Sequence, residues 1–592
     1  MHKIQALLIS FIFLISGCLN SSVPDENDIS QYEWWEVPLE KRHLMDLNFS
    51  SWRSTLPVKG IYDWTGPTEY FVEVDLPLEE RDAGYPEDPL MHVALWMPNV
   101  PEGTLVPVIA TVHPYYEFAG SNPNTIPDLG IGQWVLEEFV PHGYALAQIS
   151  TFGSGKSTHC QDVKGLGEQI GIQAAVDWLG KQPWSNGNVG LMGKSYAGTT
   201  NWEAAQNPSP HLKTIVPISG TTGLHPLLYK NGSAEARSQV MHMSYFSSTV
   251  DYNADDLDNI CPDIIEGFFA GPVTYGLGEL DPYMENYYDE RSHIDKAFGE
   301  WSGSVYWVQG LQDWNVDPHQ VFGGPSGTHW YQAYIDAGYE VRGILGQWGH
   351  DYPDQWQKHD DLTSGYGGEA FQNMTRWDWA QDLFEWFEYY LKDIGPAPAL
   401  HAQVQRNDGE WRIEETWPPL DVERMSLDMS ECSNDGAFLG GGAPVVGGGQ
   451  VVTVECPAMS DSNLHIAGLA TLHLQAVPTF DGGQVFIEMQ DAETGLRLGH
   501  ATMDIRYHAG GYDAQTVIPG VAVTMMMEFQ AIDAILPAGH GLLFIMSDQG
   551  EDYLAPACGN ACTVHVLPSS STLELPIIDR DGSNVLITPQ SE

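Results

Sequence analysis

Positive charge is scarce in this sequence of 592 residues. It has 25 lysine and arginine residues against 79 aspartate and glutamate residues, and its formal net charge is −54. Such a chain would repel a polyanion, so we exclude nucleic acid as a general partner. The acidic residues are spread along the chain rather than gathered in one tail. This distribution indicates a solvated surface that keeps the protein soluble.

Cysteines and metal-binding motifs are also few. The chain has seven cysteines and neither a CxxC pair nor an HExxH motif, so we expect no metal site and no cofactor. Apart from Cys18, the cysteines are Cys160, Cys261, Cys432, Cys456, Cys558 and Cys562. The last two share a loop, and Cys432 and Cys456 flank a glycine-rich stretch, so both pairs are plausible disulfides. The sequence leaves the connectivity open.

The apolar run at the start of the chain is too short for an ordinary membrane-spanning helix. Lys3 precedes this run at residues 6–15, which has the length of a signal-peptide core. It leads into Leu-Ile-Ser-Gly-Cys, ending at Cys18, which resembles a prokaryotic lipobox. We therefore expect an exported lipoprotein with a signal peptide at residues 1–18, a lipidated Cys18 and a membrane anchor. A plain secretory signal that ends in Gly-Cys is the alternative.

The length of the chain indicates two or three domains, and 43% hydrophobic residues indicate a globular protein. After a tether and N-terminal segment at residues 19–64, apolar strand-like runs alternate with helical patterns. Continuous apolar runs, such as Leu105 to Val112 and Tyr144 to Ile149, are typical of strands buried on both faces. We predict an α/β domain at residues 65–395 with a parallel sheet and a helical cap inserted at residues 224–296.

After Pro396 the sequence changes character. Short strand-like segments recur, including Val485 to Met489 and Gly541 to Met546, and turns rich in Gly, Asp and Pro separate them. This pattern predicts an all-β sandwich over residues 396–592.

A serine lies between one predicted strand and the next helix. The stretch Val-Gly-Leu-Met-Gly-Lys-Ser-Tyr-Ala-Gly ends an apolar run and places Ser195 among small residues. A sharp strand-to-helix turn of this kind exposes a serine hydroxyl, and its usual pattern is G-x-S-x-G. Here Ala197 stands at the last position and the glycine follows at Gly198. The pattern alone is weak, because an ordinary turn would look the same.

Two further residues follow later strands in the order that α/β-hydrolases use. Asp313 follows the strand Val305 to Gln309, and His350 follows the strand Val341 to Leu345. A serine needs a histidine to take its proton, and a carboxylate orients that histidine. Asp313 alone could be a turn cap and His350 a loop histidine, but the order of all three predicts a catalytic triad.

A serine hydrolase also needs two donors for the oxyanion of its tetrahedral intermediate. The backbone N–H of Tyr196, directly after the serine, is one candidate. The second is the hydroxyl of Tyr115, in the loop after the Leu105 to Val112 strand. A buried structural role for Tyr115 is the alternative.

At these residues the chain resembles the Xaa-Pro dipeptidyl-peptidase and cocaine-esterase-like (CocE/NonD) family of serine hydrolases. The stretches that carry the resemblance are GKSYAG, HPYY, GLQDWNV, GQWGH, NYYDERS, LFEWFEYYLKDIG and DGEWRIEETWPP. The resemblance covers roughly residues 65 to 590. The resemblance implies an α/β-hydrolase domain, a helical cap and a C-terminal jelly roll. It also implies Ser195, Asp313 and His350 as catalytic residues and supports Tyr115 as an oxyanion donor.

The resemblance leaves the substrate open between two branches. The lysine of GKSY and the GLQDWNV loop favour cleavage after proline, so a peptidase that releases Xaa-Pro dipeptides is the first expectation. An acyl esterase or amidase with the same triad is the second. A surface lipoprotein that binds glycans or peptides and carries an inactive hydrolase domain is an alternative of another class. The oligomeric state stays open.

Overall fold

The computed structural model describes residues 53–580 and 586–587, with gaps. The gaps are residues 78–87, 117–121, 129, 236–237, 239–260, 262–281, 323–328, 355–375, 377, 433–436, 440–449, 511–513, 551–552 and 555–561. The predicted lipobox with Cys18, the tether, and much of the predicted cap lie outside the described residues. No helix in the described part of the chain is long and apolar enough to cross a membrane.

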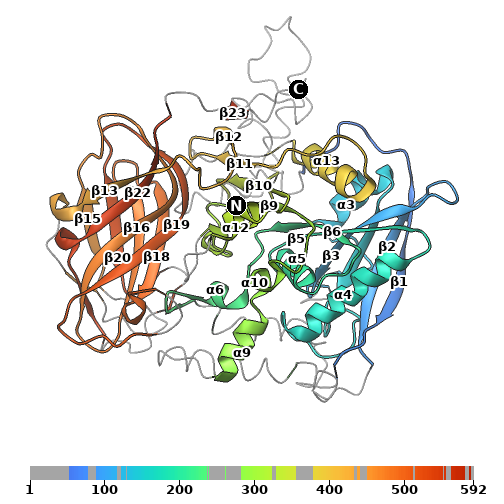
Figure 1. Ribbon diagram of the computed structural model, residues 1–592, viewed down its shortest axis with the longest axis horizontal. Coiled ribbons are helices and arrows are strands. Elements are labelled where there is room, and N and C mark those ends of the chain that lie inside the picture. Colours follow the sequence, from blue (N-terminus) through green and yellow to red (C-terminus); the bar gives the residue numbers. More distant parts are fainter. Residues whose placement is uncertain are drawn as a thin grey trace, which may run out of the picture. The chain divides into compact units, whose positions relative to one another are not determined.

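One sheet organises the first two thirds of the chain (Figure 1). Its strands are, in spatial order, β1 (Trp64–Glu73), β2 (Leu90–Pro98), β4 (Ala145–Ser150), β3 (Val106–His113), β5 (Ser185–Lys194), β6 (Leu212–Ile218), β9 (Ser304–Gly310), β10 (Val341–Gly346), β11 (Ala402–Gln405), β12 (Trp411–Glu414) and β23 (Leu586–Ile587). The strands from β4 to β11 are parallel, and those at both edges pair antiparallel. The sheet thus continues beyond residue 396, where the sequence predicted the sandwich to begin.

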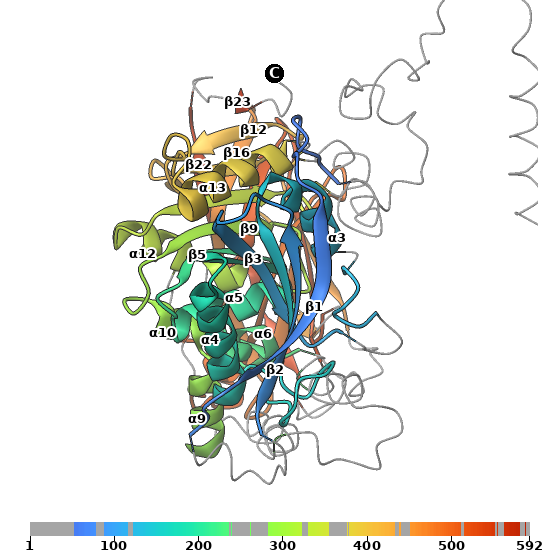
Figure 2. The ribbon, with the colours of Figure 1, turned by 90° about the vertical axis from the view of Figure 1, so that its right-hand side faces the viewer.

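Helices cover both faces of this sheet. One face packs against α4 (Leu166–Lys181), α5 (Tyr196–Gln206), α10 (His293–Ala297) and α12 (Trp330–Asp336), and the other against α3 (Gly132–Glu138) and α13 (Trp379–Lys392). Figure 2 shows α4, α10 and α12 on one side and α3 on the other. Along β9, Val305 and Trp307 belong to the first core, whereas Tyr306 and Val308 belong to the second. The alternation explains why these strands read as continuous apolar runs.

The insertion after β6 is described only in part. It contains α6 (Leu224–Leu228), the short hairpin β7 (Tyr229–Lys230) and β8 (Ser233–Ala234), and α9 (Pro282–Glu290). Shorter helices elsewhere are η5 (Val140–His142), α11 (His319–Phe322), η9 (Met429–Glu431), η10 (Ile505–Tyr507) and η12 (Pro568–Ser570).

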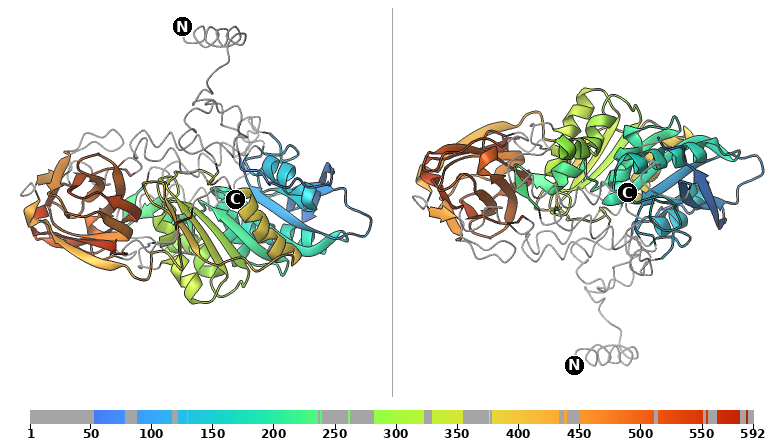
Figure 3. Two further views of the ribbon diagram at one scale, coloured as in Figure 1. Left: turned by 90° about the horizontal axis from the view of Figure 1, so that it is seen from above. Right: turned by 90° about the horizontal axis from the view of Figure 1, so that it is seen from below.

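Antiparallel sheets form a C-terminal β domain, drawn in orange to red in Figures 1 and 3. One sheet contains β13 (Glu423–Asp428), β22 (Thr572–Ile578), β16 (Leu464–Pro478), β21 (Val564–Val566), β14 (Ala437–Leu439) and β19 (Val523–Leu536); the other contains β15 (Val452–Cys456), β20 (Leu542–Ser547), β17 (Gln484–Asp491) and β18 (Arg497–Asp504). Inward side chains such as Leu472, Met489 and Phe544 form one apolar core. The predicted fold class, a mixed α/β domain followed by a β domain, is confirmed.

Two disulfides are fully described. The Cys432–Cys456 bond matches one of the pairs that the sequence suggested. The Cys160–Cys261 bond joins the loop before α4 to the cap segment across 101 residues. Cys562 is also disulfide-bonded, and Cys558 lies outside the described residues.

Candidate active site

Ser195 stands on a strained turn at the point where β5 ends and α5 begins. Its backbone angles are φ 63° and ψ −123°, outside the regions that residues with a side chain normally occupy. Its N–H donates a hydrogen bond to the carbonyl of Ile218 on the neighbouring strand at 2.9 Å. Such strain persists only where the surrounding structure imposes it, and it is typical of functional positions.

Glycine at two nearby positions makes this turn possible. A Cβ at Gly198 would lie 2.7 Å from the carbonyl oxygen of Ile218 and 2.9 Å from the Cα of Gly220. A Cβ at Gly193 would lie 2.7 Å from the carbonyl oxygen of Ala197. The second glycine of the motif comes one residue later than in G-x-S-x-G because α5 contacts the end of β6 at that point.

His350 and Asp313 meet in the loops that follow β10 and β9. The Nδ1 atom of His350 lies 2.9 Å from Oδ2 of Asp313. Asp313 is fully buried, and its other oxygen accepts the N–H groups of Asn315 and Val316, both at 2.9 Å. A carboxylate held in this way accepts a proton-bearing Nδ1, which leaves Nε2 of the ring free to take up a proton. The side chain of His350 is 21% exposed.

A cavity of about 550 Å³ opens beside these residues. Ser195 lines it from the turn between β5 and α5, His350 from the loop after β10, and Tyr115 from the loop after β3. Its other lining residues are Thr111, His113, Tyr116, Asn122, Ile126, Asp128, Ile131, Gly193, Lys194, Ala197 and Tyr352. Ser195, His350 and Tyr115, which the sequence predicted as site residues, therefore share one cavity. Asp313 does not line it and contacts the Nδ1 atom of His350.

The loop that carries Tyr115 is held by a buried histidine. The N–H of Tyr115 donates to Nδ1 of His113 at 3.2 Å, and the His113 ring stacks on Tyr116 with centroids 4.0 Å apart. Burial lowers the pKa of His113 to about 4, so the ring is neutral at neutral pH and can accept this hydrogen bond. The Tyr115 ring meets the Tyr196 ring edge to face at 6.0 Å.

Lys194 has a role at this site that the sequence did not predict. Its ammonium donates to the backbone carbonyl of His350 at 2.7 Å and lies 5.1 Å from the centroid of the Tyr352 ring. It therefore ties the elbow directly to the histidine loop. Sequence reasoning noted this lysine only through the family resemblance, because 156 residues separate the two partners.

Among the described residues, one group has the geometry to hold a metal ion. Asp491, Glu493 and His540 of the β domain lie within ligand distance of one another. Nδ1 of His540 lies 2.9 Å from Asp491, and Glu493 accepts the N–H of Gly541 at 2.8 Å. None of them lines the cavity beside Ser195.

The fold and the site together define a class of protein. The sheet has the order β1-β2-β4-β3-β5-β6-β9-β10, Ser195 stands on a sharp turn after β5, and Asp313 and His350 follow β9 and β10. This is the arrangement of an α/β-hydrolase.

Comparison with known proteins narrows this class to a family. Residues 88–352 match the family described as "X-Pro dipeptidyl-peptidase (S15 family)". A Streptomyces avermitilis protein named "Putative Xaa-Pro dipeptidyl-peptidase" is 24% identical over 84% of this chain and 81% of its own length. The Xaa-Pro dipeptidyl-peptidase of Ligilactobacillus salivarius is 22% identical over 62% of this chain and 50% of its own length. Over residues 88–352 the chain is therefore similar to the S15 family of serine hydrolases, which includes Xaa-Pro dipeptidyl-peptidases.

Solved structures agree on the fold. An aminopeptidase from a marine sediment archaeon, a member of the Thaumarchaeota, superposes with a TM-score of 0.65 at 15% identity, covering 89% of this chain and 98% of its own. A CocE/NonD family hydrolase from Staphylococcus aureus superposes with a TM-score of 0.61 at 14% identity, covering 89% of this chain and 99% of its own. These similarities support the two-domain architecture and carry no statement about substrate.

Proposed function

We propose that this protein is a serine peptidase that releases Xaa-Pro dipeptides from the N-termini of peptides. The observation that carries the proposal is the strained Ser195 elbow beside a His350 ring that is oriented by the buried Asp313. The family match and the names of the relatives support the choice of peptides as substrates. The proposed reaction is an acyl transfer in which the substrate forms an ester with the serine.

In the proposed mechanism, the Ser195 hydroxyl attacks the carbonyl carbon of the proline residue while Nε2 of His350 takes its proton. Asp313 stabilises the resulting imidazolium. The N–H of Tyr196 and the hydroxyl of Tyr115 bind the oxyanion, and each such donor contributes about 3–4 kcal/mol to transition-state stabilisation. His350 then passes the proton to the leaving amine, the C–N bond breaks, and water hydrolyses the acyl-enzyme by the same steps.

An acyl esterase would use the same residues, so the experiment must separate the two branches. We would compare hydrolysis of Gly-Pro-p-nitroanilide, its N-blocked form and p-nitrophenyl butyrate by the chain that begins after Cys18. Ser195→Ala is the control. The peptidase proposal predicts fast cleavage of the free Gly-Pro substrate alone, lost in Ser195→Ala.

Other outcomes of this experiment reassign the function. Hydrolysis of the butyrate alone would place the protein in the esterase branch with the same residue roles. If none of the three substrates is hydrolysed and Ser195→Ala leaves every biological activity unchanged, a surface binding protein with an inactive hydrolase domain is favoured.

We also propose that the protein is exported and anchored through a lipid on Cys18. The support is the lipobox-like sequence at residues 14–18 and the polar stretch that follows it. Metabolic labelling with a radioactive fatty acid should mark the wild-type chain and leave Cys18→Ala unlabelled. Equal labelling of the two would show that the lipid is not attached at this cysteine.

A further inference from the structure

The residue after the serine has a side chain that does not face the cavity. Tyr196 is 3% exposed, and its hydroxyl donates to Oε2 of Glu168 on α4 at 2.8 Å. The ammonium of Lys164 lies 3.3 Å from the centroid of its ring. The tyrosine whose backbone N–H is the proposed oxyanion donor is therefore held by a hydrogen bond at its tip and a cation on its face.

These partners belong to a fully buried charged cluster, which we define as Lys164, Glu168 and Glu203. Glu168 and Glu203 are 0% exposed and Lys164 is 2% exposed. The Lys164 ammonium donates to Glu203 at 3.4 Å, and its backbone N–H donates to Oε2 of Glu168 at 3.2 Å. Burial, with the nearby Glu168 charge, raises the pKa of Glu203 well above its ordinary value. The cluster thus holds one basic and two acidic side chains together in the buried interior.

Stability alone is a poor reason to keep such a cluster. Apolar residues of similar volume often replace buried ion pairs with no loss, or with a gain, in stability. The loop that supplies Lys164 is also strained, because Val163 and Lys164 have positive φ angles of 26° and 68°. Such angles cost about 1–3 kcal/mol at a residue with a side chain. Burial and strain together mark this cluster as a functional feature.

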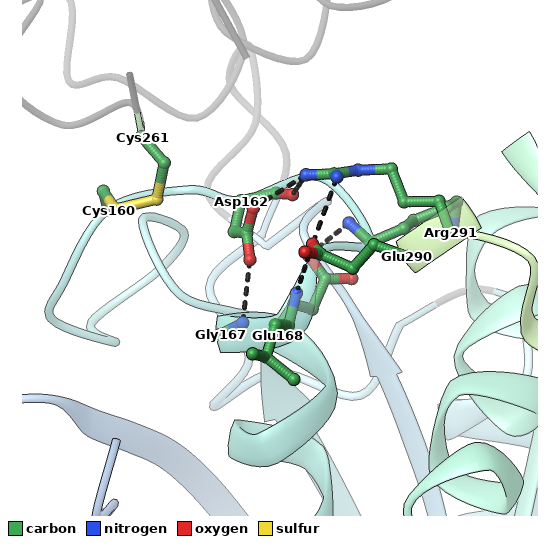
Figure 4. The surroundings of a disulfide bond; sticks show 9 residues. Cys160, Asp162, Gly167, Glu168, Cys261, Glu290 and Arg291 are labelled. Carbon is green, nitrogen blue, oxygen red and sulfur yellow. Dashed lines mark hydrogen bonds and ion pairs between the residues drawn. A yellow bond between two sulfur atoms is a disulfide. The ribbon is translucent and has the colours of Figure 1, made fainter. Parts of the chain in front are cut away.

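The base of the cap holds this loop in place. Arg291, at the end of α9, donates to Oδ1 of Asp162 at 2.9 Å and to the carbonyl of Val163 at 3.2 Å. Asp162 in turn accepts the N–H of Gly167 at the start of α4 at 2.8 Å. Figure 4 shows Arg291 and Glu290 reaching toward Asp162 and α4, beside the Cys160–Cys261 disulfide.

The Tyr196 ring also supports the second proposed oxyanion donor, since the Tyr115 ring packs edge-on against it at 6.0 Å. We propose that Glu168 and Lys164 are positioning residues that hold the Tyr196 ring. Through this ring they fix both the N–H of Tyr196 and the hydroxyl of Tyr115 for the oxyanion. Neither residue touches substrate. The inference rests on the proposed function, because it assigns these two donors to the oxyanion.

Two variants test this role with little change in volume. Tyr196→Phe removes only the hydroxyl that Glu168 holds, and Glu168→Gln keeps an acceptor while it removes the charge. We would measure kcat and KM on the substrate that wild type prefers, together with the rate at which a fluorophosphonate labels Ser195. Labelling needs the serine, the histidine and the oxyanion donors but is indifferent to the peptidase or esterase branch.

Each variant should lose about tenfold in kcat and in labelling rate with KM nearly unchanged, because a displaced donor weakens transition-state binding alone. Tyr334→Phe is the matched control. Tyr334 is equally buried, and its hydroxyl donates to the carbonyl of Ile294 at 3.2 Å, away from the cavity. It should lower the melting temperature about as much as Tyr196→Phe does and leave kcat and labelling unchanged.

The losses should also be coupled. In a Tyr115→Phe background, Tyr196→Phe should cost less than it does in wild type, because the second donor is already absent. Wild-type kcat and labelling in Tyr196→Phe and Glu168→Gln would overturn the positioning role while leaving the proposed function intact. A wild-type protein that is neither labelled nor active would overturn the proposed function and this inference with it.

Discussion

At the scale of single residues, the site depends on contacts that fix backbone atoms rather than on reactive groups alone. Ser195 is held by the Ile218 carbonyl, His350 by Asp313 at its ring and by Lys194 at its carbonyl. Positioning of this kind matters because a displacement of about 1 Å at a reacting group can cost about a hundredfold in rate.

Replacing Lys194 with methionine should loosen the histidine loop. The change removes the donor to the His350 carbonyl and keeps most of the apolar stem. We expect kcat to fall about tenfold, because the histidine samples unproductive positions. Lys213→Met is the control, since its ammonium also binds a backbone carbonyl, that of Pro210 at 2.8 Å, on an exposed surface. Equal kcat values in the two variants would show that Lys194 does not position the loop of His350.

At the scale of elements, the junction of β5, α5 and β6 leaves no room for added atoms. Gly198→Ala places a Cβ against backbone of β6 and of the loop after it, which cannot rotate away. We expect a loss of about 2–3 kcal/mol in unfolding free energy and at least a tenfold loss in kcat, because α5 must shift. Gly499→Ala in β18 meets its nearest atom at 3.5 Å and should change neither. Urea denaturation and steady-state kinetics test both variants.

A carboxyl on β19 should make stability depend on pH. Burial raises the pKa of Glu528 to about 7, against the opposing charges of Arg424 and Lys230. Between about pH 4.5 and 7 the unfolded chain loses this proton while the folded chain keeps it, so this group lowers stability as pH rises through that window. Glu528→Gln should therefore be more stable than wild type at pH 8, by at most about 3 kcal/mol, and equal to it near pH 4.

Glu574 supplies the control for this effect. It lies on β22, which pairs with the other edge of β16, and its side chain is 41% exposed. Chemical denaturation at pH 4 and pH 8 should show no such gain in Glu574→Gln. A Glu528→Gln variant with the same stability difference from wild type at both pH values would contradict the assignment.

At the scale of the whole molecule, the loop after β9, which carries Asp313, contacts the hydrolase domain, the cap segment and the β domain. Asp317, four residues after Asp313, binds Lys230 of β7, Gln530 of β19 and the hydroxyl of Tyr553 at 3.0 Å. Burial alone would raise the pKa of Asp317, but Lys230 holds it below the ordinary value. The β domain therefore contacts the loop that orients His350.

Removing the cation from this junction should affect stability and activity together. Lys230→Met leaves a buried carboxylate without its counter-charge, which costs about 3–5 kcal/mol, and it should lower kcat because the loop of Asp313 shifts. Lys296→Met breaks an exposed pair with Asp289 at 3.0 Å and should cost less than 1 kcal/mol. Calorimetry and kinetics on both variants are the test. A Lys230→Met protein as stable as Lys296→Met would show that the contact between Lys230 and Asp317 does not contribute to stability.

The sequence predicted the parts of this molecule that repeat a local pattern. Apolar runs ended where Ser195, Asp313 and His350 begin their loops, so strand ends and chain order placed all three at one sheet edge. The Lys194 contact, the Cys160–Cys261 bond and the burial of Lys164 were out of reach, because each joins segments that only the folded chain brings together. The sequence placed β11 and β12 in the sandwich, because a short strand at the edge of the α/β sheet has the same sequence pattern as a short strand of the β domain.

We propose above that Ser195 carries out the release of Xaa-Pro dipeptides from free N-termini. The most direct test of this proposal is mass spectrometry of a nonapeptide that begins Gly-Pro, incubated with wild type and with Ser195→Ala, beside an N-acetylated copy and a copy that begins Gly-Ala. Wild type alone should release a heptapeptide and free Gly-Pro from the first peptide, and the N-acetylated and Gly-Ala peptides should stay intact. An intact Gly-Pro peptide, or equal cleavage by Ser195→Ala, would contradict the proposal.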